Sequence, residues 1–142
     1  MRNIDHFIDG RRVPGTSGRH GDVFDPNSGQ VQARVALASV AELDRAVQSA
    51  AVAQRDWAKV NPQRRARVMF EFKRLLEANM DELAALLSSE HGKVHSDSRG
   101  DIQRGLEVIE FACGIPQLLK GEFSEGAGPG IDVYSVGQPL GV

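Results

Sequence analysis

Short apolar runs separated by turn residues occupy the first 37 positions, and this pattern predicts short β-strands rather than helices. An Asp-Gly pair at 9–10 separates two short runs and is typical of a tight hairpin turn. The segment DPNSG at 25–29 is a second turn signal, and apolar residues then recur at alternate positions from Val31 to Val35. We therefore expect residues 1–37 to form a β-hairpin or a small β-layer.

The apolar spacing then changes to the period of a helix. Ser39 and Glu42 form a capping-box sequence, in which the hydroxyl accepts a backbone amide of the first turn and the carboxylate returns to the amide of the cap. Asn61-Pro62 predicts the start of a second helix, because Asn caps well and proline at the first position needs no amide donor. Its helical spacing continues to Gly92, which suits the position after a helix end. The buried candidates of this second helix are Met69, Phe70, Leu75 and Leu76.

A third helix is expected to begin near Ser96 or Asp97 and to end or kink at Pro116. The ten residues at 121–130, GEFSEGAGPG, have the composition of a loop. Residues 131–136 alternate as a strand without an evident local partner, so its edges favour pairing with another chain or with further sequence. Because the chain stops inside an apolar run, we expect it to be truncated. One apolar stripe lines the third helix: Ile102, Leu106, Ile109 and Cys113.

The composition is that of a globular domain, with 41% hydrophobic and 25% charged residues. The 17 basic and 19 acidic residues give a formal charge of −2, which predicts no electrostatic attraction to nucleic acid or to an anionic membrane. A single cysteine excludes an internal disulfide and fits a reducing compartment. No signal-peptide pattern and no apolar run of membrane-spanning length is present, so we expect a cytoplasmic location.

The single cysteine and one pair of histidines are candidates for chemistry. Cys113 as a nucleophile would require a base or a helix amino terminus to ionise the thiol. It lies instead near the carboxyl end of its helix and on the apolar stripe, so we interpret it as a buried structural residue. His91 and His95 have the spacing of a metal-binding pair, but Gly92 is expected to end the helix between them and no third ligand is evident. Surface histidines are the favoured interpretation.

The glycine-rich run GAGPG at 126–130 resembles a phosphate-binding loop in composition alone. Such a loop connects a strand to the amino terminus of a helix, with GxGxxG or GxxxxGK[ST] spacing. Neither spacing is present here, and the run leads into a predicted strand. We interpret it as a flexible connector.

Arg104 is the remaining candidate for binding chemistry. It lies about 200° around the helix from Ile102, away from the apolar stripe, and shares its face with Val108 and Phe111. A partly desolvated guanidinium in this place can bind a carboxylate through two parallel hydrogen bonds. The alternative is an ion pair with Glu107, three residues further on, which contributes only a few tenths of a kcal/mol. The spacing alone favours the ion pair.

An ordered set of segments resembles the amino-terminal part of the NAD-dependent aldehyde dehydrogenases. The segments are HFIDG, DVFDPNSGQV, SVAELDRAVQSAAVAQRDWAKVNPQRRARVMFEF, LLSSEHGK, SDSRGDIQRGLEVIEFA and the terminal QPLGV. The stretch RGLEVIEFACGIPQLLKGEFSE, followed by GIDVYS and QPLGV, is similar to the CoA-acylating methylmalonate-semialdehyde dehydrogenases of that superfamily. The similarity covers essentially all 142 residues.

The resemblance implies an α/β fold with a Rossmann-type NAD domain, a catalytic domain and a β-arm used in assembly. Residues 1–37 would be leading strands, 38–125 helices that pack on a Rossmann sheet absent from this chain, and 126–142 a loop and the oligomerisation-arm strand. The implied reaction converts methylmalonate semialdehyde to propionyl-CoA, or malonate semialdehyde to acetyl-CoA, in a homotetramer. Valine, pyrimidine and inositol breakdown remain open as its metabolic context.

In this family the nucleophilic cysteine and the sites for NAD and for CoA, the co-substrate, lie beyond the sequence matched here. Cys113 does not match the nucleophile, so the resemblance implies no catalytic, cofactor-binding or metal-binding residue in this chain. Arg104 matches the arginine of the RG-E helix that helps to hold the carboxylate of the substrate. We therefore expect Arg104 to select the substrate and the chain alone to be inactive. Two alternatives are another semialdehyde dehydrogenase and a non-catalytic truncated product with a role in assembly.

Overall fold

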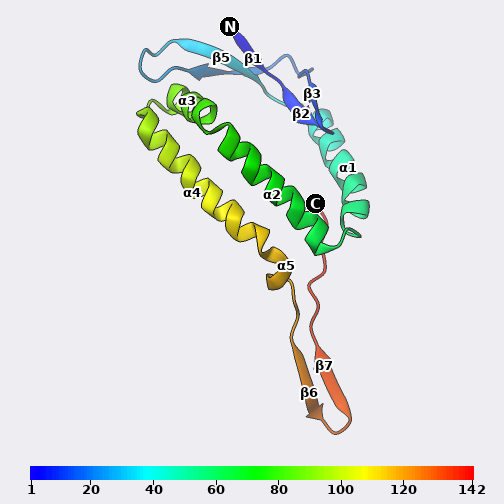
Figure 1. The fold of residues 1–142 in the computed structure, drawn as a ribbon. Helices are drawn as coiled ribbons and strands as arrows, with labels where there is room; N and C mark the ends of the chain where they lie inside the picture. Colours follow the sequence, from blue (N-terminus) through cyan, green and yellow to red (C-terminus); the bar gives the residue numbers. More distant parts are fainter.

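The computed structural model describes residues 1–142 and begins with a layer of short strands (Figure 1). In the three-stranded sheet β1 runs parallel to β5, and β4 runs antiparallel to it on the other side. A separate antiparallel hairpin consists of β2 and β3. The β-layer expected in residues 1–37 is confirmed. The strands are β1 (Arg2–Ile4), β2 (His6–Ile8), β3 (Arg11–Val13), β4 (His20–Phe24) and β5 (Val31–Ala36).

Both predicted turns connect adjacent antiparallel strands. Asp9 and Gly10 have φ angles of 55° and 71°, the left-handed values that a two-residue hairpin turn requires. In the second turn, the side chain of Asp25 accepts a hydrogen bond from the amide of Asn27 at 2.9 Å. Such a bond from the side chain to the backbone stabilises the turn without any distant contact. Both turn predictions are therefore confirmed.

Five helices follow: α1 (Val40–Trp57), α2 (Pro62–Ala78), α3 (Met80–His91), α4 (His95–Cys113) and α5 (Ile115–Leu118). The predicted starts of the first two helices are confirmed. Ser39 and Glu42 form both hydrogen bonds of the capping box at the start of α1. The side-chain oxygen of Asn61 accepts the amide of Arg64 at 2.9 Å, with proline at the first position of α2.

The helical spacing that runs to Gly92 belongs to two helices, not one. Asn79 lies between α2 and α3, and its side-chain amide donates to the carbonyl of Leu75 at 2.7 Å. An asparagine that binds nearby backbone in this way competes with the regular helix, which explains the break. Gly92 ends α3 with a φ of 83°, as predicted. A Cβ atom at this position would also lie 2.8 Å from Cγ of Pro26, so the close approach of the β4–β5 turn requires glycine as well.

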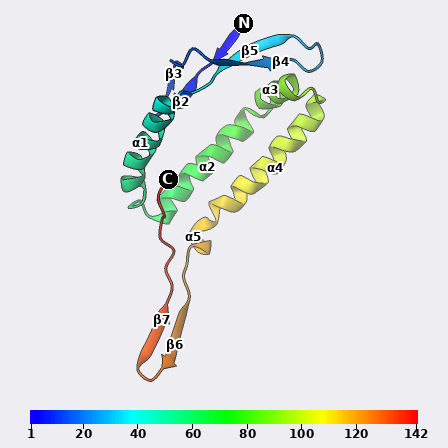
Figure 2. The same ribbon diagram turned by 180° about the vertical axis from the view of Figure 1, so that it is seen from behind.

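The longest helix, α4, packs against α2 and α3 along the predicted apolar stripe. Leu106 and Cys113 are buried, and Ile102 and Ile109 are partly buried. Figures 1 and 2 show α2 and α4 side by side from opposite directions. The helix begins at His95, slightly before the predicted start, and ends before Pro116, as predicted.

The buried candidates in α2 are only half correct. Met69 and Leu76 are partly buried, but Phe70 is 58% exposed and Leu75 45% exposed. The apolar pattern identifies side chains that need cover, but no element of this chain covers that side of α2. The prediction of burial therefore fails for Phe70 and Leu75.

Beyond α5 the chain forms an antiparallel hairpin of β6 (Phe123–Gly128) and β7 (Ile131–Tyr134), which projects away from the helices (Figures 1 and 2). The expectation of a loop followed by an unpartnered strand is wrong, because Phe123 pairs with Tyr134. The pairing shifts register between Ser124 and Gly128, and glycines in strands commonly mark such irregularities. Because the segment is rich in glycine, its composition predicted a loop and not a strand.

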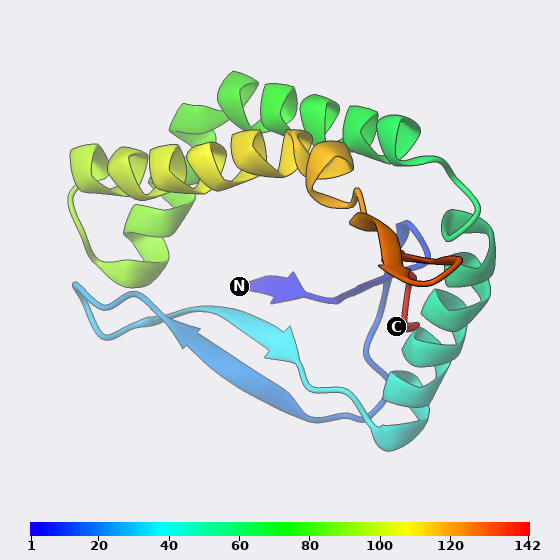
Figure 3. The ribbon, with the colours of Figure 1, turned by 90° about the horizontal axis from the view of Figure 1, so that it is seen from below.

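The chain buries very little of itself. Seen from below, α2, α3 and α4 lie along one side and β4 and β5 along the other, with α1 at one end (Figure 3). Only 8 of 142 residues are buried, and most large apolar side chains of the helices keep an open side. None of the helices combines the length and apolar composition that a membrane span requires. The buried hydrophobic residues are Ala33, Ala36, Ala66, Ala84, Leu106 and Cys113.

The exposed apolar faces predict that the isolated chain binds a hydrophobic dye and unfolds without a sharp transition. Phe72 is 47% exposed on α2, so Phe72→Glu should weaken the dye fluorescence. The control Gln103→Glu, at an exposed polar position of α4, should leave it unchanged. A cooperative thermal melt together with a monomeric sedimentation profile would contradict the prediction.

Candidate functional site

Arg104 lies in the middle of α4, on the face that turns away from α2 and α3. Its side chain is 76% exposed, so nothing in this chain desolvates it. Val108 and Phe111, which were predicted to share this face, are each 68% exposed. The side-by-side placement of these residues is confirmed, and the face is open to a bound molecule. The role of Arg104 in substrate binding stays a prediction.

The guanidinium of Arg104 forms an ion pair on the amino-terminal side of its helix. Its Nη1 atom donates a hydrogen bond to Oδ1 of Asp101 at 3.0 Å. The alternative pairing with Glu107 is therefore wrong, although the three-residue separation is the same. Asp101 is a better partner for Arg104 than Glu107 is, because a second cation already holds the carboxylate of Asp101 in place.

That second cation is Lys93, in the connection between α3 and α4. Its Nζ atom binds Oδ2 of Asp101 and lies 2.7 Å from Oδ2 of Asp97, and its side chain is only 15% exposed. The hydrogen bond from Lys93 lowers the pKa of Asp101. The bonds to Asp101 and Asp97 raise the pKa of Lys93, so Lys93 and Asp101 stay ionised near neutral pH. The sequence argument missed this cluster because Lys93 lies before the helix that it stabilises.

One edge of the Arg104 guanidinium has no partner in the chain. The Nη1 atom is the only one of its nitrogens that forms a hydrogen bond, which leaves Nε and Nη2 free. These two atoms carry parallel N–H groups on one side of the plane and match the two oxygens of a carboxylate. The arrangement can therefore bind an organic acid and still keep its intramolecular ion pair.

The other candidate residues lie apart from Arg104. Cys113 is buried at the end of α4, as predicted for a structural cysteine. His91 ends α3 and His95 begins α4, so the two histidines lie on different helices. In the run at 126–130, residues 126–128 belong to β6 and residues 129–130 form the turn into β7. The run does not lead to a helix, so it does not fit a dinucleotide phosphate loop. The interpretation as a flexible connector is also wrong, because most of the run is strand.

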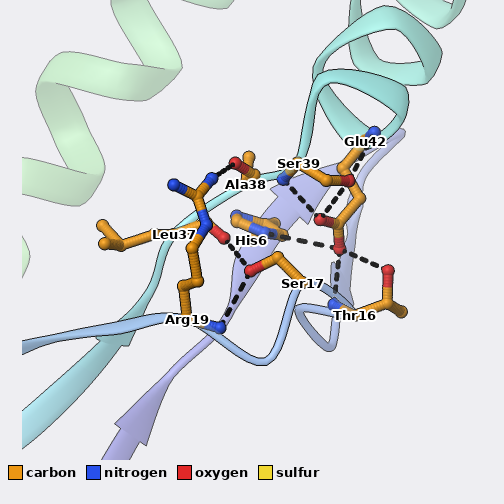
Figure 4. A network of polar contacts seen from close by, with 8 residues as sticks. All are labelled: His6, Thr16, Ser17, Arg19, Leu37, Ala38, Ser39 and Glu42. Atoms are coloured by element: carbon orange, nitrogen blue, oxygen red, sulfur yellow. Dashed lines mark hydrogen bonds and ion pairs between the residues drawn. The ribbon is translucent and has the colours of Figure 1, made fainter.

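A buried carboxylate, Glu42, forms a second polar cluster (Figure 4). Its side chain is 2% exposed and accepts four hydrogen bonds. Two come from Ser39, at 2.7 Å from its amide and 2.8 Å from its hydroxyl, and two from Thr16, at 2.6 and 2.9 Å from the same groups. The amide of Ser39, followed by that of Thr16, lowers the pKa of Glu42 from 4.5 to about 2. The capping box indicated the Ser39 half of this cluster, but no local signal indicated Thr16.

The ring of His6 lies beside the same carboxylate, although its sequence position suggests an isolated residue. Its Nε2 atom is buried without a hydrogen-bond partner and lies 3.9 Å from Oε1 of Glu42 (Figure 4). Because four donors already satisfy Glu42, the carboxylate is not free to act as a base. The cluster joins the connection before β4 to the start of α1, and its role is structural.

Comparisons with known proteins agree in one family. The model of the aldehyde dehydrogenase family matches residues 13–142. A malonate-semialdehyde dehydrogenase of Pseudomonas aeruginosa is 42% identical over 142 residues, which are 100% of this chain and 28% of the relative. Malonate-semialdehyde dehydrogenase 2 of Geobacillus thermodenitrificans is 43% identical over 141 residues, which are 99% of this chain and 29% of the relative. The chain therefore spans less than a third of these curated relatives.

Solved structures give the same result for the fold. A protein of Sinorhizobium meliloti 1021, assigned as a methylmalonate-semialdehyde dehydrogenase and complexed with NAD, is 61% identical with a TM-score of 0.95. The match covers 99% of this chain and 29% of that structure. A methylmalonate-semialdehyde dehydrogenase of Oceanimonas doudoroffii is 44% identical with a TM-score of 0.93, over 99% of this chain and 28% of that structure. The α/β arrangement described above is thus that of the amino-terminal part of these proteins.

The Glu42 cluster can be tested in an intact hybrid enzyme, in which residues 1–142 are joined to the rest of the S. meliloti protein. Glu42→Gln should lower its melting temperature by several degrees at neutral pH, because one carboxylate oxygen becomes an NH2 group that faces the N–H donor of either Ser39 or Thr16. The lowered pKa means that the ionised carboxylate stabilises the fold above about pH 4.5, and that this stabilisation is lost as the pH falls toward 2.

The difference in melting temperature between the unmodified hybrid and its Glu42→Gln variant should therefore become smaller as the pH falls from about 5 to about 3. Differential scanning calorimetry measures both melting temperatures. Glu107→Gln removes an exposed carboxylate without an ion pair and should leave the melting temperature unchanged. A difference that stays constant with pH would show that Glu42 does not stabilise the fold through its charge.

Proposed function

The chain belongs to the aldehyde dehydrogenase family, and on this premise we propose that it is the amino-terminal part of an NAD-dependent, CoA-acylating methylmalonate-semialdehyde dehydrogenase. In the proposed reaction the aldehyde carbon loses a hydride to NAD⁺ and becomes an acyl group on CoA, and the carboxylate leaves as CO₂. The products are propionyl-CoA from methylmalonate semialdehyde and acetyl-CoA from malonate semialdehyde. The similarity to malonate- and methylmalonate-semialdehyde dehydrogenases over the whole chain supports this proposal.

Arg104 is the residue of this chain that the proposed reaction uses. The substrate carries a carboxylate beside the aldehyde, and the free Nε–Nη2 edge of Arg104 can bind both of its oxygens. A neutral aldehyde of similar size leaves that charge without a partner, so the arginine discriminates between the two. This free edge on the RG-E helix is the observation that carries the proposal. Arg104 orients the substrate and takes part in no bond-making.

Arg104→Ala in the hybrid enzyme should lower kcat/KM for malonate semialdehyde by about 10- to 100-fold, mainly through KM, as expected for the loss of charge-assisted hydrogen bonds. The value for propanal should change little, because propanal has no carboxylate. NADH formation measures both rates. Arg99→Ala, at a partly exposed position of the same helix, serves as the control and should affect both aldehydes equally. A similar loss for both aldehydes with Arg104→Ala would contradict the role.

The rest of the chain has supporting roles in the proposed enzyme. Residues 1–37 are leading strands, the helices within 38–125 pack on the sheet of the NAD domain, and residues 126–142 take part in the assembly of a homotetramer. The exposed apolar faces of the helices and of the β6–β7 hairpin support this division. NAD and CoA bind outside these residues, and the nucleophilic cysteine also lies outside them. The proposed enzyme is located in the cytoplasm, which is a reducing compartment.

The exposed hairpin also favours a second candidate function, in which the chain joins an intact partner enzyme without catalysis. Phe123 and Tyr134 pair across the two strands and are 65% and 73% exposed. The fluorescently labelled chain should then co-sediment with the intact S. meliloti protein, and Tyr134→Glu should abolish this. Co-sedimentation that survives the substitution, or none at all, would exclude the hairpin as the means of assembly.

We expect the 142-residue chain by itself to convert no aldehyde. Its single cysteine is buried between helices, and its glycine-rich run belongs to a β-hairpin and not to a dinucleotide-binding loop. The absorbance of NADH in the presence of malonate semialdehyde, NAD⁺ and CoA measures this directly. Any turnover above the rate without protein would contradict the assignment of the reactive groups to another part of the enzyme.

A further inference from the structure

We propose that Asp101 is a positioning residue, which fixes one nitrogen of the Arg104 guanidinium and directs its free edge toward the carboxylate of the substrate. The inference rests on the substrate-binding role proposed for Arg104. It adds a second residue that determines specificity without contact with the substrate.

The two oxygens of Asp101 have different partners, and this division carries the argument. Oδ1 accepts the hydrogen bond from Nη1 of Arg104 at 3.0 Å, and Oδ2 binds Nζ of Lys93. A free carboxylate would bind an arginine with both oxygens and occupy two of its nitrogens. Because Lys93 occupies one oxygen, Asp101 holds Arg104 at a single point, and the edge that recognises a carboxylate stays open.

Lys93 also fixes the position of Asp101. Its ammonium binds Asp97 as well as Asp101, and it is the most buried group of the cluster at 15% exposed. Asp101 is 40% exposed and Arg104 76% exposed, so the network runs from a buried anchor to a solvent-facing guanidinium. An arginine has several rotatable bonds and loses entropy when a ligand immobilises it. A guanidinium that is already held by one nitrogen loses less of this entropy on binding.

Removal of Asp101 should change the affinity for the acid aldehyde in opposite directions if Asp101 positions Arg104 or if it acts only through its charge. Asp101 is an anion next to a cation that binds an anion, so on charge alone its removal strengthens substrate binding. If Asp101 acts by orienting Arg104, its removal weakens binding of the acid aldehyde. Glu107 provides the reference for the charge effect, because it also lies three residues from Arg104 along the helix but forms no ion pair with it.

The test is made in the hybrid holoenzyme with malonate semialdehyde and propanal as substrates. Asp101→Ala should raise KM for malonate semialdehyde about three- to tenfold and leave KM and kcat for propanal unchanged. Glu107→Ala should leave KM for malonate semialdehyde unchanged or lower it slightly. Asp101→Glu, which keeps the carboxylate, should restore most of the loss. An unchanged or lower KM with Asp101→Ala would overturn the positioning role.

A double-mutant cycle separates positioning from a merely structural effect. In an enzyme that already carries Arg104→Ala, Asp101→Ala should have no further effect on malonate semialdehyde, because the residue through which it acts is gone. An equal loss in both backgrounds would show that Asp101 acts elsewhere and would overturn the proposal. If Arg104→Ala discriminates between the aldehydes and Asp101→Ala does not, only the positioning role fails. If Arg104→Ala itself does not discriminate, the substrate-binding role proposed for Arg104 fails and the inference fails with it.

Discussion

The close packing of α4 against α2 and α3 determines where every polar group of the candidate site lies. Small residues make this packing possible: Ala84 and Ser98 are 0% exposed, and the hydroxyls of Ser88 and Ser98 lie 2.8 Å apart. Leu106 adds the largest buried side chain of α4, at 3% exposed. With one side of the helix fixed in this way, the opposite side carries Arg104 outward by the geometry of the helix alone. The position of the arginine is therefore a consequence of apolar packing.

Local signals predicted the elements of this chain well, because their causes lie within a few residues. The cap at Ser39, the start at Pro62 and the end at Gly92 depend on backbone groups that neighbouring side chains can reach. The direction of Arg104 followed in the same way from the apolar stripe. Its partner did not, because the choice between Asp101 and Glu107 depends on Lys93, which lies outside the helical repeat.

Two further failures, the missed Thr16 and the exposed Phe70, depend on which segments far apart in the sequence lie against each other. Thr16 binds a carboxylate 26 residues away, and no periodicity marks that pair. Phe70 has the spacing of a core residue, but its side chain is exposed because burial depends on what lies opposite. This chain spans less than a third of its relatives, and its own elements leave Phe70 exposed. The apolar pattern is therefore a poorer guide to burial here than in a chain with a large buried core.

The close approach of Gly92 to Pro26 connects the surroundings of Arg104 to a distant part of the fold. The β4–β5 turn lies against the end of α3, where Gln32 also donates to the carbonyl of Ser89 at 2.9 Å. The next residue along the chain is Lys93, the anchor of the ion-pair cluster. A displacement of the turn would shift the backbone of Lys93, and through the ion pairs of Asp101 it would reach the guanidinium of Arg104. The orientation of this arginine is therefore coupled to a turn between two strands near the start of the chain.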